Sequence, residues 1–288
     1  MRDFVIMTDS CCDLPPELAE GLVVLPLTVH MEGQDYRNLL DGSEIGFEDF
    51  YARLRSGRMP LTSAVSVGDF QTRMRELLTE EKDILCICFS SGLSTTYQSA
   101  SIAADDLRPE FPDAKICVVD SLCASLGQGL LVYLAAQEKK LGRSFEELCT
   151  FVELTKEHVC HWFTVDDLNH LKRGGRISGA TALFGTMLSI KPVMHVDDDG
   201  HLVPVSKTRG RKASLLALVD HMEKTALNPG AQTVFISHGD CLADARFVAG
   251  EIRRRFGTET ITINFVGPVI GSHSGPGTVA LFFLGSKR

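Results

Sequence analysis

The 288-residue sequence lacks the short motifs that mark the commonest nucleotide, zinc and serine-hydrolase sites. It contains no G-x-x-x-x-G-K-[ST] loop for phosphates, no H-E-x-x-H pair for zinc and no G-x-S-x-G turn for a nucleophilic serine. It also contains no C-x-x-C pair, and the adjacent residues Cys11 and Cys12 are poorly placed to share a metal ion. We therefore expect neither a metal nor a cofactor.

Long apolar runs are absent as well. No stretch reaches 18 apolar residues, and the start of the chain is too short in apolar residues for a signal peptide or a membrane span. We therefore expect a soluble, cytoplasmic protein. The nine cysteines stand mostly singly in apolar stretches, which is typical of buried free thiols in a reducing compartment. A strand with mixed side chains explains His158, Cys160 and His161 better than a metal site does.

Basic residues are scarce in the first half of the chain. Residues 1–158 contain 14 Lys and Arg against 26 Asp and Glu, a net charge of −12, and residues 159–288 contain 15 against 11, a net charge of +4, which sum to the −8 of the whole chain. An acidic half of this size argues against nucleic-acid binding. The basic second half is compatible with an anionic small molecule or with the acidic face of a partner protein.

Strand and helix signals alternate through the first half. Short apolar runs at residues 3–10, 84–89 and 115–119 predict buried strands, and helical patterns cover residues 70–81, 93–107 and 123–140. Two capping boxes, which begin at Ser66 and Ser144, predict helix starts. This alternation indicates an α/β domain over residues 1–158, with a parallel sheet covered by helices on both faces. Ligands of such folds lie beyond the carboxyl ends of strands, which here carry the polar residues 8–10, 90–94 and 120–121.

The second half reads differently. Six strand candidates follow one another, at residues 160–165, 191–196, 201–207, 232–237, 260–266 and 278–285. Asp199 and Gly200 predict a hairpin turn between the second and the third, and helical patterns cover residues 211–226 and 242–256. We therefore expect a second, α+β domain over residues 159–288, with a mostly antiparallel sheet and the ligand between the two domains.

Three hydroxyl-bearing segments, each expected to be a loop, are candidates for a binding site. They contain Thr62, then Ser90, Ser91 and Ser94, and finally His273 in the stretch 267–283, whose glycine-rich part predicts a flexible loop before the last strand. Each has a structural explanation too, since Ser94 is a plausible N-cap and a single histidine in a glycine loop is usually structural. Helix starts and hydroxyls without lysine or arginine suit one carboxylate better than a polyphosphate. The apolar stretch 176–194 is either a core helix or the wall of an apolar tunnel.

Seven segments, in order along the chain, resemble the DegV family of bacterial fatty-acid-binding proteins. They are TDSCCDLP (8–15), TSAVSVGDF (62–70), FSSGLSTTYQSA (89–100), VVDSLCASLGQG (118–129), LNHLKRGGRIS (168–178), KPVMHVDDDGHLVPVSKTRGRKA (191–213) and GPVIGSHSGPGTVAL (267–281). The resemblance implies a long-chain, palmitate-like fatty acid, buried in an apolar tunnel between a parallel and an antiparallel domain. It also implies that Thr62, Ser94 and His273 hold the carboxylate.

Further residues follow from the same resemblance as candidates. For the head group they are Ser10, Ser91, Ser121, Ser272 and Gly275. For the tail they are Leu93, Phe184, Met187, Leu188, Ile190 and Phe282. The family implies a lipid-binding subunit that is not itself an enzyme, whose bound acid a separate ATP-dependent fatty acid kinase phosphorylates for phospholipid synthesis. The candidates to face that partner, or to make transient contact with a membrane surface, are Lys172, Arg173, Arg176 and Arg209.

The sequence departs from the family pattern near the head group. Leu61 precedes Thr62, TSAVS stands where TSQPS is common, and Thr95 replaces the usual glycine after Ser94. These changes leave the head-group donors in place but put the acyl preference in doubt. Two other functions stay open: a serine hydrolase acting on acyl esters, with Ser94 as nucleophile, His273 as base and Asp9 or Asp120 as orienting acid, and a regulator that binds a small anion.

Overall fold

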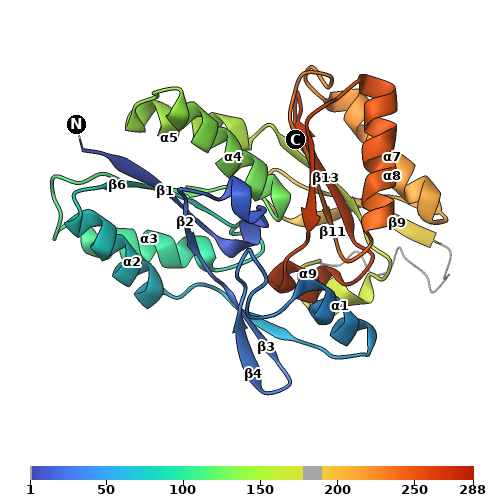
Figure 1. The fold of residues 1–288 in the computed structure, drawn as a ribbon, viewed down its shortest axis with the longest axis horizontal. Helices are drawn as coiled ribbons and strands as arrows, with labels where there is room; N and C mark the ends of the chain where they lie inside the picture. Colours follow the sequence, from blue (N-terminus) through green and yellow to red (C-terminus); the bar gives the residue numbers. More distant parts are fainter. Residues whose placement is uncertain (1, 178–189) are drawn as a thin grey trace.

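The computed structural model describes residues 2–177 and 190–288, and it contains two large sheets (Figure 1). The first is a four-stranded parallel sheet in the order β2-β1-β6-β7. Its strands are β1 (Phe4–Asp9), β2 (Val23–Leu25), β6 (Asp83–Cys88) and β7 (Ile116–Asp120). The predicted parallel sheet is therefore confirmed.

Helices cover both faces of this sheet. Alternate residues of β6 enter two different cores, since Ile84 and Cys86 pack in one cluster and Leu85 and Ile87 in another. The first cluster lies under α2 (Val67–Thr79) and α3 (Thr96–Leu107), the second under α4 (Leu126–Lys140) and α5 (Phe145–Lys156). The Ser66 hydroxyl accepts from the Asp69 amide, and Ser144 and Glu147 form the predicted capping box.

A small arm follows β2, and the sequence analysis did not foresee it. It consists of an antiparallel three-stranded sheet, order β4-β3-β5, and helix α1 (Phe47–Arg55). The strands are β3 (Thr28–Met31), β4 (Gln34–Arg37) and β5 (Leu61–Ser63). Thr62, which we expected in a loop, therefore lies on a strand opposite Val29. Strands of three or four residues carry too few side chains to give a readable alternation.

The second large sheet contains all six predicted strands in the order β10-β9-β8-β13-β11-β12. They are β8 (Val159–Thr164), β9 (Ile190–Val196), β10 (Leu202–Arg209), β11 (Val234–His238), β12 (Ile261–Phe265) and β13 (Val279–Leu284). Only β11 and β12 pair in parallel, so the predicted mostly antiparallel sheet is confirmed. The hairpin turns at Gly200, whose φ of 78° suits glycine. Helices α7 (Arg211–Thr225) and α8 (Leu242–Phe256) pack on one face of the sheet.

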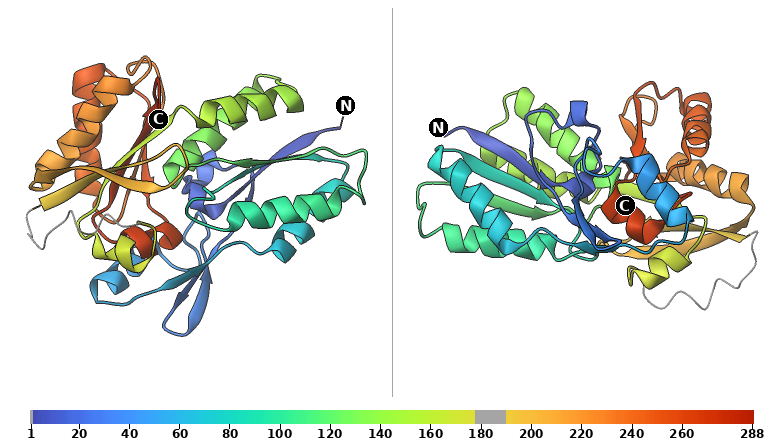
Figure 2. Two further views of the ribbon diagram at one scale, coloured as in Figure 1. Left: turned by 180° about the vertical axis from the view of Figure 1, so that it is seen from behind. Right: turned by 60° about the horizontal axis from the view of Figure 1, so that its bottom comes forward.

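Helix α4 packs against both large sheets, as Figures 1 and 2 show. Seven consecutive residues, 126–132, are buried in it, which an amphipathic surface helix does not allow. Gly127 is required for this packing, because a Cβ there would lie 2.0 Å from Nε2 of His161 on β8. The proposed boundary between residues 158 and 159 stays a prediction, although β8 begins at Val159.

The glycine-rich stretch before β13 forms a helix, which corrects the predicted loop. Helix α9 spans Pro268–Ser274 and begins with a proline, a residue suited to the first helical turn. Gly271 allows close packing on α1, because a Cβ there would lie 2.6 Å from the Tyr51 hydroxyl oxygen. In the sequence, glycines that permit close helix packing could not be told from glycines of a loop.

The remaining elements are α6 (Asn169–Arg173) and the 3-10 turns η1 (Ser10–Cys12) and η2 (Pro16–Leu18). Within the described residues, no helix is long and apolar enough to cross a membrane.

Candidate ligand-binding site

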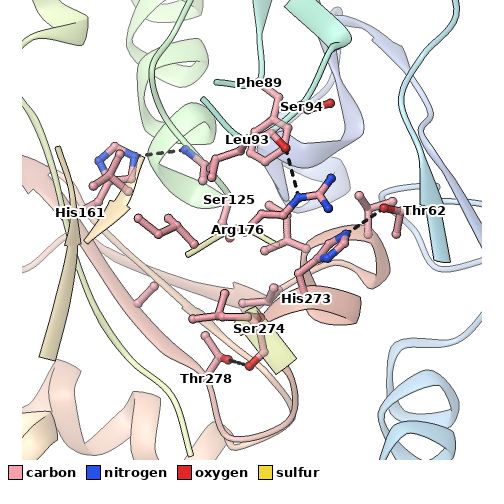
Figure 3. A pocket seen from close by; sticks show the side chains of 18 of the residues that line it. Thr62, Phe89, Leu93, Ser94, Ser125, His161, Arg176, His273, Ser274 and Thr278 are labelled. Carbon is pink, nitrogen blue, oxygen red and sulfur yellow. Dashed lines mark hydrogen bonds between the residues drawn. The ribbon is translucent and has the colours of Figure 1, made fainter. Parts of the chain in front are cut away.

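A cavity of about 430 Å³ lies where the arm, the carboxyl edge of the parallel sheet, helix α9 and the second sheet meet (Figure 3). This volume falls in the range of about 300–1,000 Å³ that is usual for small-molecule sites. Most side chains that line the cavity are apolar. They include Leu27, Phe89, Leu93, Phe163, Leu171, Val196, Leu202, Val266, Val269, Ile270, Ala280 and Phe282.

The second sheet contributes alternate residues of its inner face to this wall. Phe163 of β8 stands opposite Ala280 of β13. Two residues away on each strand, His161 stands opposite Phe282. All four line the cavity, because side chains two residues apart on a strand point to the same side. The Trp162 ring lies between these residues in sequence and stacks instead on His221 of α7.

Thr62 and His273 meet at one end of the cavity, although they lie 211 positions apart in the sequence. The Thr62 hydroxyl and the His273 Nε2 are 2.8 Å apart in a hydrogen bond (Figure 3). Burial, together with the nearby Arg176 charge, lowers the pKa of His273 to about 4. The imidazole is therefore neutral at neutral pH and can exchange hydrogen bonds with a ligand without carrying a charge.

Arg176 supplies a positive charge to the same wall. Its Nε donates to the Leu93 carbonyl at 3.3 Å, and its guanidinium also bonds the Gly174 carbonyl. Burial lowers its pKa, yet an arginine side chain stays protonated in proteins. From the sequence, Arg176 was predicted to face a partner, and the hydroxyl-bearing segments contain no lysine or arginine. The fold brings it in from a separate segment after α6, and no local spacing signals that approach.

Ser94 lies in the cavity wall near the start of α3. Its Oγ accepts from the Thr96 amide at 3.2 Å and is 2.8 Å from the Thr96 hydroxyl. The N-cap position belongs to Thr95, whose side chain makes no capping bond. Ser94 thus supports the helix start from one residue earlier than an N-cap. Ser91 also lines the cavity, and its amide donates to Asp120 at 3.1 Å.

The other head-group candidates lie away from the cavity lining. The Ser10 hydroxyl accepts from the Leu27 amide at 3.0 Å, and the Ser121 hydroxyl accepts from the Cys123 amide at 3.1 Å. Ser272 donates back to the Pro268 carbonyl of its own helix at 2.7 Å. Gly275 ends α9 with a φ of 80°. Each of these side chains or turns has a local structural role.

Of the tail candidates, Leu93 and Phe282 line the cavity. Ile190 opens strand β9 and is half-buried, but it is not part of the described lining. Phe184, Met187 and Leu188 lie outside the described residues. Most of the apolar lining could not be predicted from the sequence, because those residues come one or two at a time from many elements.

The candidates for a partner surface divide into two groups. Lys172 and Arg173 lie exposed at the end of α6, and Arg209 lies exposed at the end of β10. Arg176, in contrast, is half-buried in the cavity wall. The exposed three stay candidates for such a surface.

The geometry does not favour a serine-hydrolase site. The Ser94 hydroxyl pairs with Thr96, and the described partner of His273 Nε2 is Thr62. Both carboxylates considered as orienting acids bond backbone amides, Asp9 those of Cys11 and Phe89, and Asp120 those of Ser91 and Leu122. The parts of a triad are present in the sequence, but these contacts hold them in other roles.

Metal ligation is not favoured either. Within the described part of the chain, no group of three His, Cys, Asp or Glu side chains is arranged to hold a metal ion. His158 bonds the Gly285 carbonyl at 3.0 Å, whereas His161 lines the cavity and bonds the Val159 carbonyl at 3.0 Å. Burial lowers the pKa of His161 well below its usual value, so its ring is neutral.

Comparisons with known proteins agree over the whole chain. The profile of an uncharacterised protein family, DegV, matches residues 3–286. A DegV domain-containing protein of Clostridium perfringens is 46% identical over 290 residues, covering 100% of this chain and 99% of that protein.

Solved structures with the same fold include a member of the same family. A DegV family protein from Thermus thermophilus, described as binding fatty acid, is 33% identical with a TM-score of 0.85, covering 98% of this chain and 99% of that one. A stearic-acid-binding protein from Eubacterium ventriosum is 26% identical with a TM-score of 0.85, covering 97% of each chain. With a family match over nearly its full length and a relative this similar, the chain belongs to the DegV family.

Proposed function

We propose that this protein binds a long-chain fatty acid in the cavity, with the carboxylate at the end formed by Thr62, Ser94, Arg176 and His273. The observation that carries the proposal is an apolar cavity with one cation and several hydroxyls at one end. Such a lining matches a molecule with one charged end and a hydrocarbon tail. The fatty-acid-binding relatives of the same fold support it.

The charge at the head end suits a carboxylate. Arg176 is the cationic side chain of the described lining, and His273 is neutral at neutral pH. One positive charge balances one carboxylate, whereas a phosphate with two charges would leave a buried charge unbalanced. The hydroxyls of Thr62 and Ser94 add donors that can be turned toward the carboxylate oxygens.

The tail contributes most of the affinity. Each buried methylene contributes about 0.8 kcal/mol, so about fifteen methylenes offer on the order of 12 kcal/mol before the costs of binding. A hydrogen bond to a charged group contributes roughly 1.5–3 kcal/mol. The head-group residues therefore orient the acid more than they retain it.

The proposal extends to a carrier role, in which a separate ATP-dependent kinase phosphorylates the bound carboxylate to an acyl-phosphate for phospholipid synthesis. The head end lies close to the surface, because Thr62 is only half-buried and stands between two exposed residues on β5. A partner's active site could therefore reach the carboxylate without removing the tail. Lys172, Arg173 and Arg209 remain the candidates to contact that kinase or a membrane surface. A kinase that uses ATP places this role in the cytoplasm.

Native mass spectrometry of the freshly purified protein, followed by organic extraction, tests the proposal. We expect a stoichiometric C14–C18 fatty acid in the extract. An apo mass that added palmitate does not shift would contradict fatty-acid binding and would favour a regulator of another small anion. Incubation with ATP and a cognate kinase, with hydroxylamine to trap acyl-phosphate, tests the carrier role separately.

A further inference from the structure

Four hydroxyl groups line the cavity away from the head end. They belong to Ser125, which precedes α4, Ser237 on β11, Ser274 at the end of α9, and Thr278 just before β13. Ser237 stands opposite Ala280 in the sheet, and Thr278 lies two residues before Ala280, just outside the strand. In Figure 3, Ser274 and Thr278 lie together, apart from Thr62 and Ser94. We call these four residues the hydroxyl cluster.

Three of the four hydroxyl protons already have acceptors. The Ser125 hydroxyl donates its one proton to the buried carboxylate of Asp13 at 2.6 Å. In its second contact, at 2.9 Å, it therefore accepts the proton of the Ser237 hydroxyl. The Thr278 hydroxyl donates to backbone carbonyls of the α9 terminus, at 3.1 Å from Ser274 and 2.9 Å from Gly275. Each hydroxyl has one proton and two lone pairs, so these residues keep free acceptor sites.

Ser274 is the exception. Its side chain is only 5% exposed, and its Oγ has no hydrogen-bond partner among the described residues. A buried hydroxyl without a partner is costly, and nearly all such groups in folded proteins find one. The hydroxyl cluster therefore presents one unused donor and several unused acceptors to the cavity.

A group that both donates and accepts satisfies this set, and a methylene satisfies none of it. A ketone or ether accepts from Ser274 but brings no proton for the lone pairs of Ser237 or Thr278. A hydroxyl does both. A second carboxylate would bring a charge close to Asp13, itself an acid, which bonds Ser125.

We propose that the cavity accepts fatty acids that carry a hydroxyl on the acyl chain, and that Ser274 selects for that hydroxyl. This inference rests on the proposed fatty-acid binding and adds a preference within that ligand class. An ordered water is the competing occupant, since it too donates and accepts. The two differ in outcome, because a ligand hydroxyl that replaces water adds affinity that depends on Ser274.

Competition binding with stearate and with its 3-, 10- and 12-hydroxy derivatives tests the proposal on the full-length protein. We expect at least one hydroxy acid to bind about three- to tenfold more tightly than stearate, as one added hydrogen bond allows. Ser274→Ala should abolish this preference and leave stearate affinity unchanged or higher. Ser272→Ala is the matched control: it lies on the same helix, its hydroxyl is satisfied by Pro268, and it should keep the preference.

The outcomes separate the two proposals. Tight binding of stearate with no preference for any hydroxy acid overturns the role of the hydroxyl cluster and leaves fatty-acid binding intact. A preference that persists in Ser274→Ala overturns it as well, because the hydroxyl is then recognised elsewhere. Failure to bind stearate or any derivative overturns the proposed function itself. Because the Ser274 side chain makes no hydrogen bond to the described residues, its alanine variant should fold normally, and a thermal melt checks this.

Discussion

The two large sheets line the cavity in different ways. The parallel sheet presents its carboxyl edge, so its contribution comes from loops with polar side chains, such as Ser91, Ser94 and Ser125. The antiparallel sheet presents a face, so its contribution comes from alternate strand residues such as Phe163 and Phe282. The edge therefore supplies most of the groups that can recognise polar atoms, and the face supplies most of the surface that can hold a tail.

The edge also contains buried charge, whose behaviour gives the largest expected effect. Asp13 follows β1 and joins the two sheets through Ser125 and Ser237. Burial raises its pKa from 3.8 to about 7, against the opposing effect of the Ser125 hydrogen bond. A group whose pKa is raised in the folded state stabilises the protein at pH values below its unfolded-state pKa. This stabilisation is lost as the pH rises through the folded-state pKa.

We therefore expect the wild type to lose stability relative to Asp13→Asn between pH 4 and pH 8. The loss should be about 4 kcal/mol, at about 1.4 kcal/mol for each pH unit between the two pKa values. Urea unfolding of both proteins across this range measures it. Parallel pH profiles for the two proteins would show that the Asp13 carboxyl does not titrate differently on folding. His273 has a lowered pKa, so it lowers stability as the pH falls below 6.5. This effect is the same in both proteins and does not change the comparison.

The head end depends on a cation that neither sheet contains. We expect Arg176→Gln to weaken palmitate binding about 10- to 100-fold, because a hydrogen bond to a charged group contributes roughly 1.5–3 kcal/mol. Binding of hexadecanol, which has no charge, should change little. Arg173→Gln, at an exposed position three residues earlier, is the control. Equal loss for palmitate and hexadecanol would mean that Arg176 supports the fold of the wall and not the carboxylate.

The contact between α4 and the face of the second sheet can be broken by one methyl group. We expect Gly127→Ala to lower the free energy of unfolding by about 1–3 kcal/mol, since the added Cβ would lie 2.0 Å from His161 Nε2. Gly250→Ala on α8 is the control, because nothing lies within 4 Å of its Cβ position. That variant should be neutral or more stable by up to about 1 kcal/mol. Thermal melts compare the two, and equal effects would contradict close packing at Gly127.

The smallest effects belong to single hydroxyls at the head end. We expect Thr62→Ala and Ser94→Ala each to weaken palmitate retention by about tenfold, the low end of the roughly 1.5–3 kcal/mol of a hydrogen bond to a charged group, because each hydroxyl exchanges a present partner, His273 or Thr96, for the carboxylate. Phosphorylation of the bound acid should fall as well, and melting temperatures should stay close to wild type. Extraction after dialysis and the hydroxylamine assay provide the measurements. Full retention and normal turnover in both variants would remove these residues from the carboxylate site.

The same comparison explains which parts of the site the sequence predicted. Ser91 and Ser94 follow a buried apolar strand, and strand ends of parallel sheets are known places for ligands, so the edge was predicted. Apart from Phe282, the residues on the face of the antiparallel sheet were not predicted. Phe163 faces the cavity and Trp162 faces away from it, but the sequence alone does not show which side of the strand packs against what. Arg176 was assigned to a partner surface for a related reason: a basic residue among other basic residues gives no sign of which one turns inward.

Local sequence determined the elements of this protein that are long and regular. The N-cap at Ser66, the capping box at Ser144, buried strands of five or more residues and the Asp199–Gly200 turn all act over a few residues, so they can be read along the chain. Only the tertiary structure decided the short strand at Thr62, the helix at His273 and the meeting of Thr62, His273 and Arg176. Those depend on close approaches between segments that are far apart in the sequence, from 33 positions for Val29 and Thr62 to 211 for Thr62 and His273, and such approaches leave no periodic trace.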